Sequence, residues 1–370
     1  MQSLEELRQI LHANPYPSGK EHETAGIISR YFDSLNPDRV VDGIGGTGIA
    51  YMFAGASNGP TVLLRCELDA IPESGRSAHR CGHDGHMAIV AGVGSAISKR
   101  RPSSGRVVLL FQPAEETGRG ARAVIDDPRF RNVAPDYAFA LHNLPGFPMG
   151  SIIVREGSFA SASRGMVVTL RGKPAHAAEP EKGISPAHSM CRLIEKLETL
   201  PAHITATRES MMVTVVGARM GGKTFGVAPG DAEVMATLRA ETDEGMKQLV
   251  RKAEDLTAGE ASANELGYTI GYEDIFPATK NSPAAVEIVR RAAGTATGIG
   301  PNTPVIVSPE RPFTWSEDFG HFTAICEGSL FGLGAGEHTS SLHSNEYEFP
   351  DELIPVGVGI FSRIVCDILG

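Results

Sequence analysis

Hydrophobic residues along this chain fall into two patterns, short continuous apolar runs and longer stretches that repeat with helical spacing. Short apolar runs are typical of strands buried on both faces, and the longer stretches are typical of helices that cover a sheet. Their alternation predicts an α/β domain with a mostly parallel sheet. We expect strands at 62–64, 107–111, 137–141 and 329–333, and helices within 3–35, at 87–99 and after Pro283.

The pattern changes near Ser161, where the following segments are expected in the order β-α-β-β-α-β. That order is typical of a compact α+β unit of the ferredoxin-like kind. We therefore predict a larger domain of residues 1–161 and 273–370, interrupted by an inserted domain of residues 162–272. The inserted domain is predicted from strands at 165–170, 210–217 and 231–240 and helices at 185–200 and 242–266.

The composition is that of an ordinary globular protein of 370 residues, which exceeds the length of a typical single core and agrees with two domains. The formal net charge of −10 makes nucleic acid and anionic membrane surfaces poor partners, so neither is expected. No run of apolar residues is long enough to predict a transmembrane helix, and the acidic residues 1–6 do not resemble the start of a signal peptide.

The cysteines are scattered and odd in number, which argues against a disulfide framework and favours a cytoplasmic location. Cys81 differs from the others because it lies between His79 and His83. The five cysteines are Cys66, Cys81, Cys191, Cys326 and Cys366.

Reactive polar side chains follow the strands expected in the larger domain. Ligands of open α/β sheets bind at the carboxyl ends of the strands, so we expect these side chains to meet at one site. They are Glu67 with Asp69, the run Cys81–His86, Glu115 with Glu116, His142, and His343.

Thiol, imidazole and carboxylate groups together form a ligand set for a divalent transition metal. Cys81 and His83 flank a single glycine, so both can reach one centre. Of the adjacent Glu115 and Glu116, one can bind metal while the other holds a proton. Taken singly, His142 also fits a hydrogen-bonded core residue and the glutamates fit a solvated turn, so the hypothesis depends on the whole set.

Two glycine motifs are interpreted as turns. Residues Gly43–Gly48 match GxGxxG, but Ile49–Phe53 after them is β-like, and a dinucleotide site needs a helix there. Residues Gly55–Gly59 match GxSxG, but they lack the strand-before, helix-after setting of a nucleophile elbow. We therefore expect a hairpin at the first motif and a plain turn at the second.

Seven stretches of the chain, in order, resemble motifs of the M20 metallopeptidases, in the branch of aminoacylases, hippurate hydrolases and auxin-conjugate amidohydrolases. They span nearly the whole chain, so the resemblance is more specific than any single motif. The stretches are RCELDAIP (65–72), HRCGHDGHMA (79–88), FQPAEETGRG (111–120), ALHNLP (140–145), KPAHAAEP (173–180), SEDF (316–319) and LHS (342–344).

The resemblance implies a site for two divalent metal ions, with Cys81 close to both. It implies Glu115 as the general base and then acid, and Asp69 as a supporting carboxylate. Mixed sulfur, nitrogen and oxygen ligands favour zinc, with manganese, cobalt or nickel as alternatives. The implied metal ligands are Cys81, His83, Glu116, His142 and His343.

The resemblance also implies that the inserted domain is a lid and dimerisation domain, so a homodimer or higher homo-oligomer is expected. His176 in that domain would stabilise the oxyanion, although a lone histidine in a small-residue loop otherwise suggests a structural role. Arg239 would hold a substrate carboxylate with its bidentate fork, and a surface salt bridge is the alternative.

Three positions depart from the family pattern. Glu67 stands where relatives usually have Asp, the 73–79 link is short, and Gly226 replaces an Asn. These changes leave the metal ligands intact and leave the substrate open.

The function predicted from these features is metal-dependent hydrolysis of the amide bond in an N-acyl amino acid or related small amide. Three alternatives remain at this point: a metal-dependent deaminase of a small aromatic amine, a di- or carboxypeptidase, and a non-catalytic protein that binds metal or an amino acid.

Overall fold

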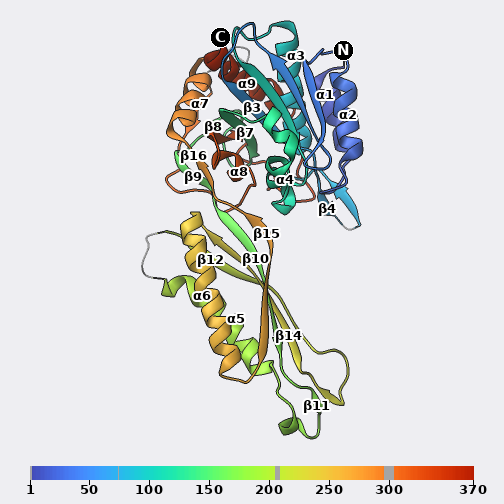
Figure 1. Cartoon of the computed structure of the whole chain (residues 1–370), viewed down its shortest axis with the longest axis vertical. Coiled ribbons are helices and arrows are strands. Elements are labelled where there is room, and N and C mark those ends of the chain that lie inside the picture. The colour runs from blue at the N-terminus through green and yellow to red at the C-terminus, as the bar shows by residue number, and fades with distance from the viewer. Residues whose placement is uncertain (1, 74, 205–208, 296–303) are drawn as a thin grey trace. The chain divides into compact units, whose positions relative to one another are not determined.

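The computed structural model describes every residue except 1, 74, 205–208 and 296–303. The chain divides into two compact units (Figure 1). The large unit comprises Met1–Phe159, Thr279–Pro312 and Glu317–Gly370, and the small unit comprises Ala160–Ala278 and Phe313–Ser316.

The large unit is built on a sheet whose described strands follow the order β1-β2-β6-β3-β7-β18-β8-β17. The central strands β6, β3, β7 and β18 are parallel and almost wholly buried, which explains their continuous apolar runs. The prediction of a mostly parallel α/β sheet is confirmed. The strands are β1 Arg39–Ile44, β2 Gly48–Ala54, β3 Thr61–Glu67, β6 Arg106–Gln112, β7 Tyr137–Leu144, β8 Ile152–Ile153, β17 Ile306–Val307 and β18 Glu327–Gly334.

Helix α3 (His83–Lys99) is buried on most of its circumference because it packs on β3 and β6 and is covered by α1 and α9. It begins directly after the turn that carries Cys81, so a rigid core helix anchors that turn. No described helix has both the length and the apolar character needed to cross a membrane. The other helices are α1 Leu4–Ala13, α2 His22–Phe32, α4 Gly120–Asp126, α7 Pro283–Thr295, α8 Gly320–Thr323 and α9 Leu353–Leu369, with 3-10 turns η1 Glu115–Thr117 and η2 Pro128–Asn132.

The first glycine motif forms the turn of the antiparallel β1-β2 hairpin, in which Ile44 pairs with Gly48. The second motif lies between β2 and β3, where no helix follows it. Both turn interpretations are confirmed. Two short pairs complete the large unit, β4 (Ile71–Glu73) with β5 (Arg76–Ala78) and β9 (Gly157–Ala160) with β16 (Thr279–Asn281).

The small unit has an antiparallel sheet in the order β12-β14-β10-β15, packed against α5 and α6 (Figure 1). Alternate residues of β14 are buried, so one face of the sheet meets the helices. Along the chain the order is β-α-β-β-α-β, as the hydrophobic pattern predicts. The elements are β10 Ala162–Arg171, α5 Ala187–His203, β12 Met211–Met220, β14 Asp231–Ala240, α6 Asp243–Ser262 and β15 Gly267–Phe276.

The small unit extends beyond residues 162–272 because β15 runs to Phe276 and because a distant segment joins it. The backbone N–H of Ser161 lies 3.0 Å from the carbonyl oxygens of both Phe313 and Trp315 and donates to them. The Ser161 hydroxyl also donates to the carbonyl oxygen of Phe313 at 2.7 Å. This attachment is not visible in the hydrophobic pattern, since it is made by polar groups.

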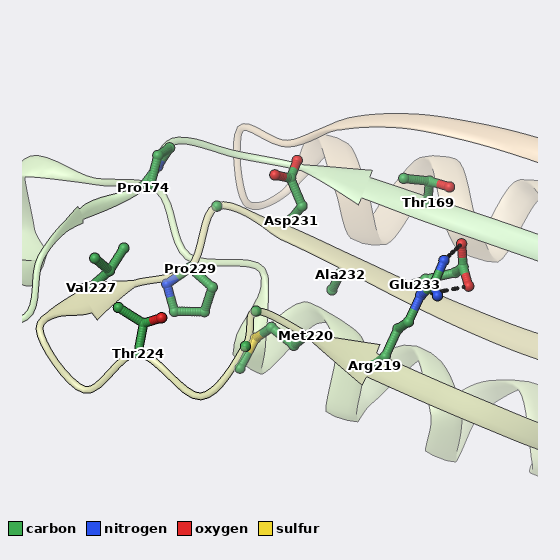
Figure 2. A pocket seen from close by; sticks show the side chains of 13 residues that line it. Thr169, Pro174, Arg219, Met220, Thr224, Val227, Pro229, Asp231, Ala232 and Glu233 are labelled. Carbon is green, nitrogen blue, oxygen red and sulfur yellow. Dashed lines mark hydrogen bonds and ion pairs between the residues drawn. The ribbon is translucent and has the colours of Figure 1, made fainter.

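A small two-stranded antiparallel sheet of the same unit carries His176. Strand β11 (Ala175–His176) pairs with β13 (Val227–Ala228), near the 3-10 turn η3 (Pro180–Lys182). Beside it lies a hollow of about 750 Å³, at whose side Arg219 and Glu233 form an ion pair (Figure 2).

Candidate metal centre

The turn before α3 sets Cys81 and His83 on either side of Gly82. Gly82 has a φ of 91°, and its carbonyl oxygen accepts from the backbone N–H groups of Gly85 and His86. A left-handed residue with a Cβ would be strained there, and that Cβ would also collide with the side-chain amide of Asn143. Glycine is therefore what allows this turn to present two ligands together.

The Cys81 sulfur is the meeting point of the expected ligands. Its Sγ lies 3.5 Å from Nε2 of His142 and 3.3 Å from Nε2 of His343. The ligand atoms of each of two groups lie within 4.8 Å of one another, and Cys81 belongs to both. The groups are Cys81, His83 and His142, and Cys81, Glu116 and His343.

The histidine rings are oriented by backbone carbonyls. His83 Nδ1 lies 2.8 Å from the carbonyl oxygen of Asp69, and His142 Nδ1 lies 3.0 Å from that of Asn143. Because Nδ1 must donate to a carbonyl, Nε2 of each ring keeps its lone pair. This is the usual orientation of metal-binding histidines.

Two buried ligand atoms have no hydrogen-bond partner among the described residues, His83 Nε2 and Glu116 Oε1. Buried polar atoms are rarely left unpaired, so such atoms indicate a place where a ligand binds. Both belong to the groups that share Cys81. The residues therefore fit divalent cations at this site.

The electrostatics of the site also favour cations. Burial and then the carboxylates of Glu116 and Glu115 raise the pKa of the Cys81 thiol, and burial raises the pKa of Glu116 to about 7. Burial opposes charging of His83, but nearby carboxylates, Glu67 first, outweigh it and raise its pKa to about 9. A bound cation reverses this preference for protons.

Asp69 supports two of these ligand segments. Its backbone oxygen accepts from His83, and its Oδ2 accepts from the backbone N–H of Glu116 at 3.0 Å and from Ser18 Oγ at 2.7 Å. One residue thus positions His83 and the η1 turn together.

Glu115 and Glu116 face different surroundings although they are adjacent in η1. Both lie near His83, but Glu116 also lies with Cys81 and His343, whereas Glu115 also lies with the carboxylates of Glu317 and Asp318. Burial and then Glu317 raise the pKa of Glu115 well above its usual value. Glu115 is therefore suited to hold a proton, while its neighbour Glu116 lies among the expected metal ligands.

A buried charge cluster around Arg65 was not recognised from the sequence. Arg65 is fully buried, and its guanidinium donates to Gln112 at 2.9 Å, to Glu317 at 2.9 Å and to Asp318 at 2.7 Å. It also binds Glu67. Arg65 and the two acidic residues do lie in the RCELDAIP and SEDF stretches, so the motifs contained the signal without its geometry.

Glu67, the departure from the family pattern, bridges two parts of the site. One of its oxygens binds Arg65, and Oε2 lies 2.7 Å from Nδ1 of His86. Since both its oxygens are used, Glu67 is not free to act as a metal ligand.

One detail of the sequence prediction needs correction: His142 lies inside β7, which continues to Leu144.

His176 and Arg239 belong to the small unit. His176 is exposed, and its Nδ1 accepts from the backbone N–H of Ala178 at 3.0 Å. Arg239 Nη1 donates to the carbonyl oxygen of Thr314 at 3.0 Å and to Ser316 Oγ at 2.9 Å, and burial lowers its pKa. Their roles in catalysis stay predictions.

The sequence profile of peptidase family M20/M25/M40 matches residues 63–367. The chain belongs to this family. The family and the enzyme class predicted from the motifs are thereby confirmed: the chain is a metal-dependent amidohydrolase.

Curated relatives cover nearly the whole chain. It is 30% identical over 349 residues to the N-acetyl-L-cysteine deacetylase of Bacillus subtilis (strain 168), covering 90% of this chain and 80% of the relative. It is 26% identical over 372 residues to the hippurate hydrolase of Campylobacter jejuni, covering 98% and 95%. A crystal structure of a B. subtilis dinuclear metal binding peptidase of the M20 family shares the fold, with a TM-score of 0.80, 23% identity and coverage of 99% and 97%.

Proposed function

We propose that this M20-family enzyme hydrolyses the amide bond of N-acyl amino acids, with water as the nucleophile. The observation that carries the proposal is the convergence of four ligand side chains on Cys81, with the protonatable Glu115 beside them. A protein that only bound metal would need the ligands but not the second glutamate.

The proposed ligands are Cys81, His83 and His142 for one divalent ion and Cys81, Glu116 and His343 for the other. When bound, such cations polarise a carbonyl and lower the pKa of water toward about 7. Zinc is our proposed metal, because thiolate, imidazole and carboxylate suit it; manganese, cobalt and nickel are the alternatives.

Glu115 acts as the proton carrier. Its Oε2 lies 3.8 Å from His83 Nε2, so Glu115 lies next to the proposed ligands without being one of them. It takes a proton from water as the new C–O bond forms at the amide carbon. It then gives that proton to the nitrogen as the C–N bond breaks, which leaves a carboxylic acid and an amine.

His176 donates to the oxyanion in this proposal. The N–H of Ala178 occupies Nδ1 as an acceptor, so the neutral ring carries its proton on Nε2 and can donate from there. Neutral donors of this kind stabilise charge that develops only in the transition state.

Arg239 is proposed to hold the substrate carboxylate. It is half-buried, and no ion pair involves it within the part of the chain that the structure describes. A salt-bridge role would require a carboxylate partner, whereas a substrate site requires the charge to be available. Two hydrogen bonds to Thr314 and Ser316 fix the side chain and leave further donors of its fork.

We also propose that the small unit is the lid and that it forms a homodimer. Its strand β12 is an edge strand with exposed apolar residues, among them Met212 and Val216. Edge strands of this kind pair readily with a second chain.

A cytoplasmic location is proposed because all five cysteines are free. Sedimentation velocity and thiol titration of the isolated protein test these two statements.

The decisive experiment is a substrate panel run with metal-reconstituted protein. It comprises N-acetyl amino acids, N-benzoyl amino acids, dipeptides and an aromatic amine, with release of free amino acid, carboxylic acid or ammonia as the readout. We expect acyl amino acids to release both acid and amino acid. Ammonia release without acid would indicate a deaminase, dipeptide cleavage alone would indicate a peptidase, and metal uptake without turnover would indicate a binding protein.

A further inference from the structure

We propose that Asn143 is a positioning residue of the metal centre, because it ties together three of the four segments that carry the proposed ligands: the turn of Cys81 and His83, strand β7 with His142, and the loop of His343. The inference rests on the proposed metal centre but not on amide hydrolysis. Asn143 is completely buried in β7, directly after His142.

The first contact of Asn143 is to His142. Its backbone carbonyl accepts from His142 Nδ1 at 3.0 Å, which directs Nε2 of that ring to the Cys81 sulfur. A peptide unit that rotated here would turn the ring away, so the position of the Asn143 backbone decides whether His142 is a ligand.

The second contact fixes that backbone through His86. The backbone N–H of Asn143 donates to His86 Nε2 at 3.2 Å, and the side-chain amide contacts the same nitrogen. The other ring nitrogen of His86 lies 2.7 Å from Glu67 Oε2, and Glu67 binds the fully buried Arg65. Asn143 is thereby anchored to the charge cluster around Arg65. With both nitrogens engaged, His86 supports the centre and is not a ligand.

The third contact leads to the loop of His343. The Asn143 amide contacts the hydroxyl of Tyr347, which is also completely buried. The backbone oxygen of Tyr347 accepts from Arg80 Nη1 at 3.0 Å, and the backbone oxygen of Arg80 accepts from the N–H of His343 at 2.8 Å. The amide thus connects His142 to the segment that carries His343, the proposed ligand farthest from Cys81 along the chain.

The fourth contact is steric. The side-chain amide of Asn143 fills the space where a Cβ of Gly82 would lie, against the turn that carries Cys81 and His83. Removing the amide would open a gap there and take one partner from the buried Tyr347 hydroxyl, and it would leave His86 Nε2 with only the backbone N–H of residue 143. Both effects loosen the ligands, and loss of outer partners of this kind typically costs about 10–100-fold in metal affinity.

The test measures divalent-metal dissociation constants of the full chain by competition with a chromophoric chelator, together with the absorption spectrum of the cobalt-loaded protein. We expect Asn143→Ala to raise the dissociation constant by about 10–100-fold and to change the thiolate-to-cobalt band, because Cys81 is displaced. Tyr347→Phe removes one hydroxyl and keeps the ring. It should change the metal dissociation constant and the cobalt band in the same direction as Asn143→Ala, but by a smaller amount.

Asn281→Ala is the matched control. Asn281 is equally buried in the large unit, and its amide makes three hydrogen bonds, to Arg155 and twice to Leu330, away from the ligands. It should lower the unfolding temperature and leave the metal dissociation constant and the cobalt spectrum unchanged.

The proposal is overturned if Asn143→Ala binds metal as the wild type does, or if Asn281→Ala weakens metal binding as much. Should Asn143→Ala fail to fold, Tyr347→Phe decides: a wild-type dissociation constant and spectrum in that variant overturn the proposal. A wild-type protein that binds no metal would instead remove the metal centre itself, so the two failures are distinguishable.

Discussion

Nε2 of His343 lies 3.3 Å from Sγ of Cys81, although 262 positions separate the two residues in the chain. His142 Nε2 approaches the same sulfur at 3.5 Å from within strand β7. Cys81 therefore belongs to both ligand groups, whereas each histidine belongs to one. This asymmetry gives the ligands different expected effects on metal content.

Cys81→Ala should reduce the bound divalent ions more than His142→Ala or His343→Ala, because it removes a ligand from both groups. The wild type should hold up to two ions per chain, and each histidine variant should mainly weaken one. Elemental analysis after dialysis against limiting metal measures the count. Cys191→Ser is the control, since Cys191 is exposed in the small unit. Equal metal content in Cys81→Ala and the wild type would contradict the shared-ligand assignment.

Glu115→Gln should keep its metal and lose about a hundredfold or more in kcat, the scale of a positioned acid–base group. Glu116→Gln is the matched comparison, because the neighbouring carboxylate lies with Cys81 and His343 and should lose metal affinity instead. Steady-state kinetics at saturating metal and elemental analysis separate the two. Near-normal turnover of Glu115→Gln would eliminate the proposed proton carrier.

His176→Ala should lower kcat by about ten- to a thousandfold, the scale of losing one oxyanion donor, with unchanged metal content. His176→Gln retains a donor, so it should recover part of the rate. A variant with normal kcat and raised KM would show that His176 binds the ground state and not the transition state.

Glu260→Gln should lower the stability of the small unit at neutral pH. Burial opposes ionisation of Glu260, but Lys196 and Arg192, each 2.7 Å away, outweigh it and lower its pKa. The folded pKa lies below the unfolded one, so the stabilisation is present above the unfolded pKa of about 4.3 and lost as pH falls through the folded value. We expect a deficit of about 1 kcal/mol at pH 7 that shrinks toward pH 4.

Fluorescence of the single tryptophan during urea unfolding measures this effect, because Trp315 belongs to the small unit. Glu244→Gln is the control on the same helix, since Glu244 is highly exposed and lies 3.9 Å from Lys247. A deficit that stayed constant between pH 7 and pH 4 would show that Glu260 acts by packing and not by charge.

Local patterns in the sequence were enough to predict the main elements and the chemistry of the ligands. Continuous apolar runs identified the central strands because a two-sided parallel sheet leaves no polar face. The order β-α-β-β-α-β was readable because each element has its own hydrophobic period. Cys81 and His83 could be paired from their spacing, since a single glycine between them leaves little choice of arrangement.

How these groups are held depends on the tertiary fold. The role of Arg65 becomes visible only in the fold, because its partners Glu317 and Asp318 lie more than 250 positions away in the sequence. Asn143 lies in the ALHNLP stretch, but its proposed role depends on His86, Tyr347 and Gly82 lying next to it in space. Ligand type is a property of a side chain, whereas orientation and burial depend on distances that sequence spacing does not encode.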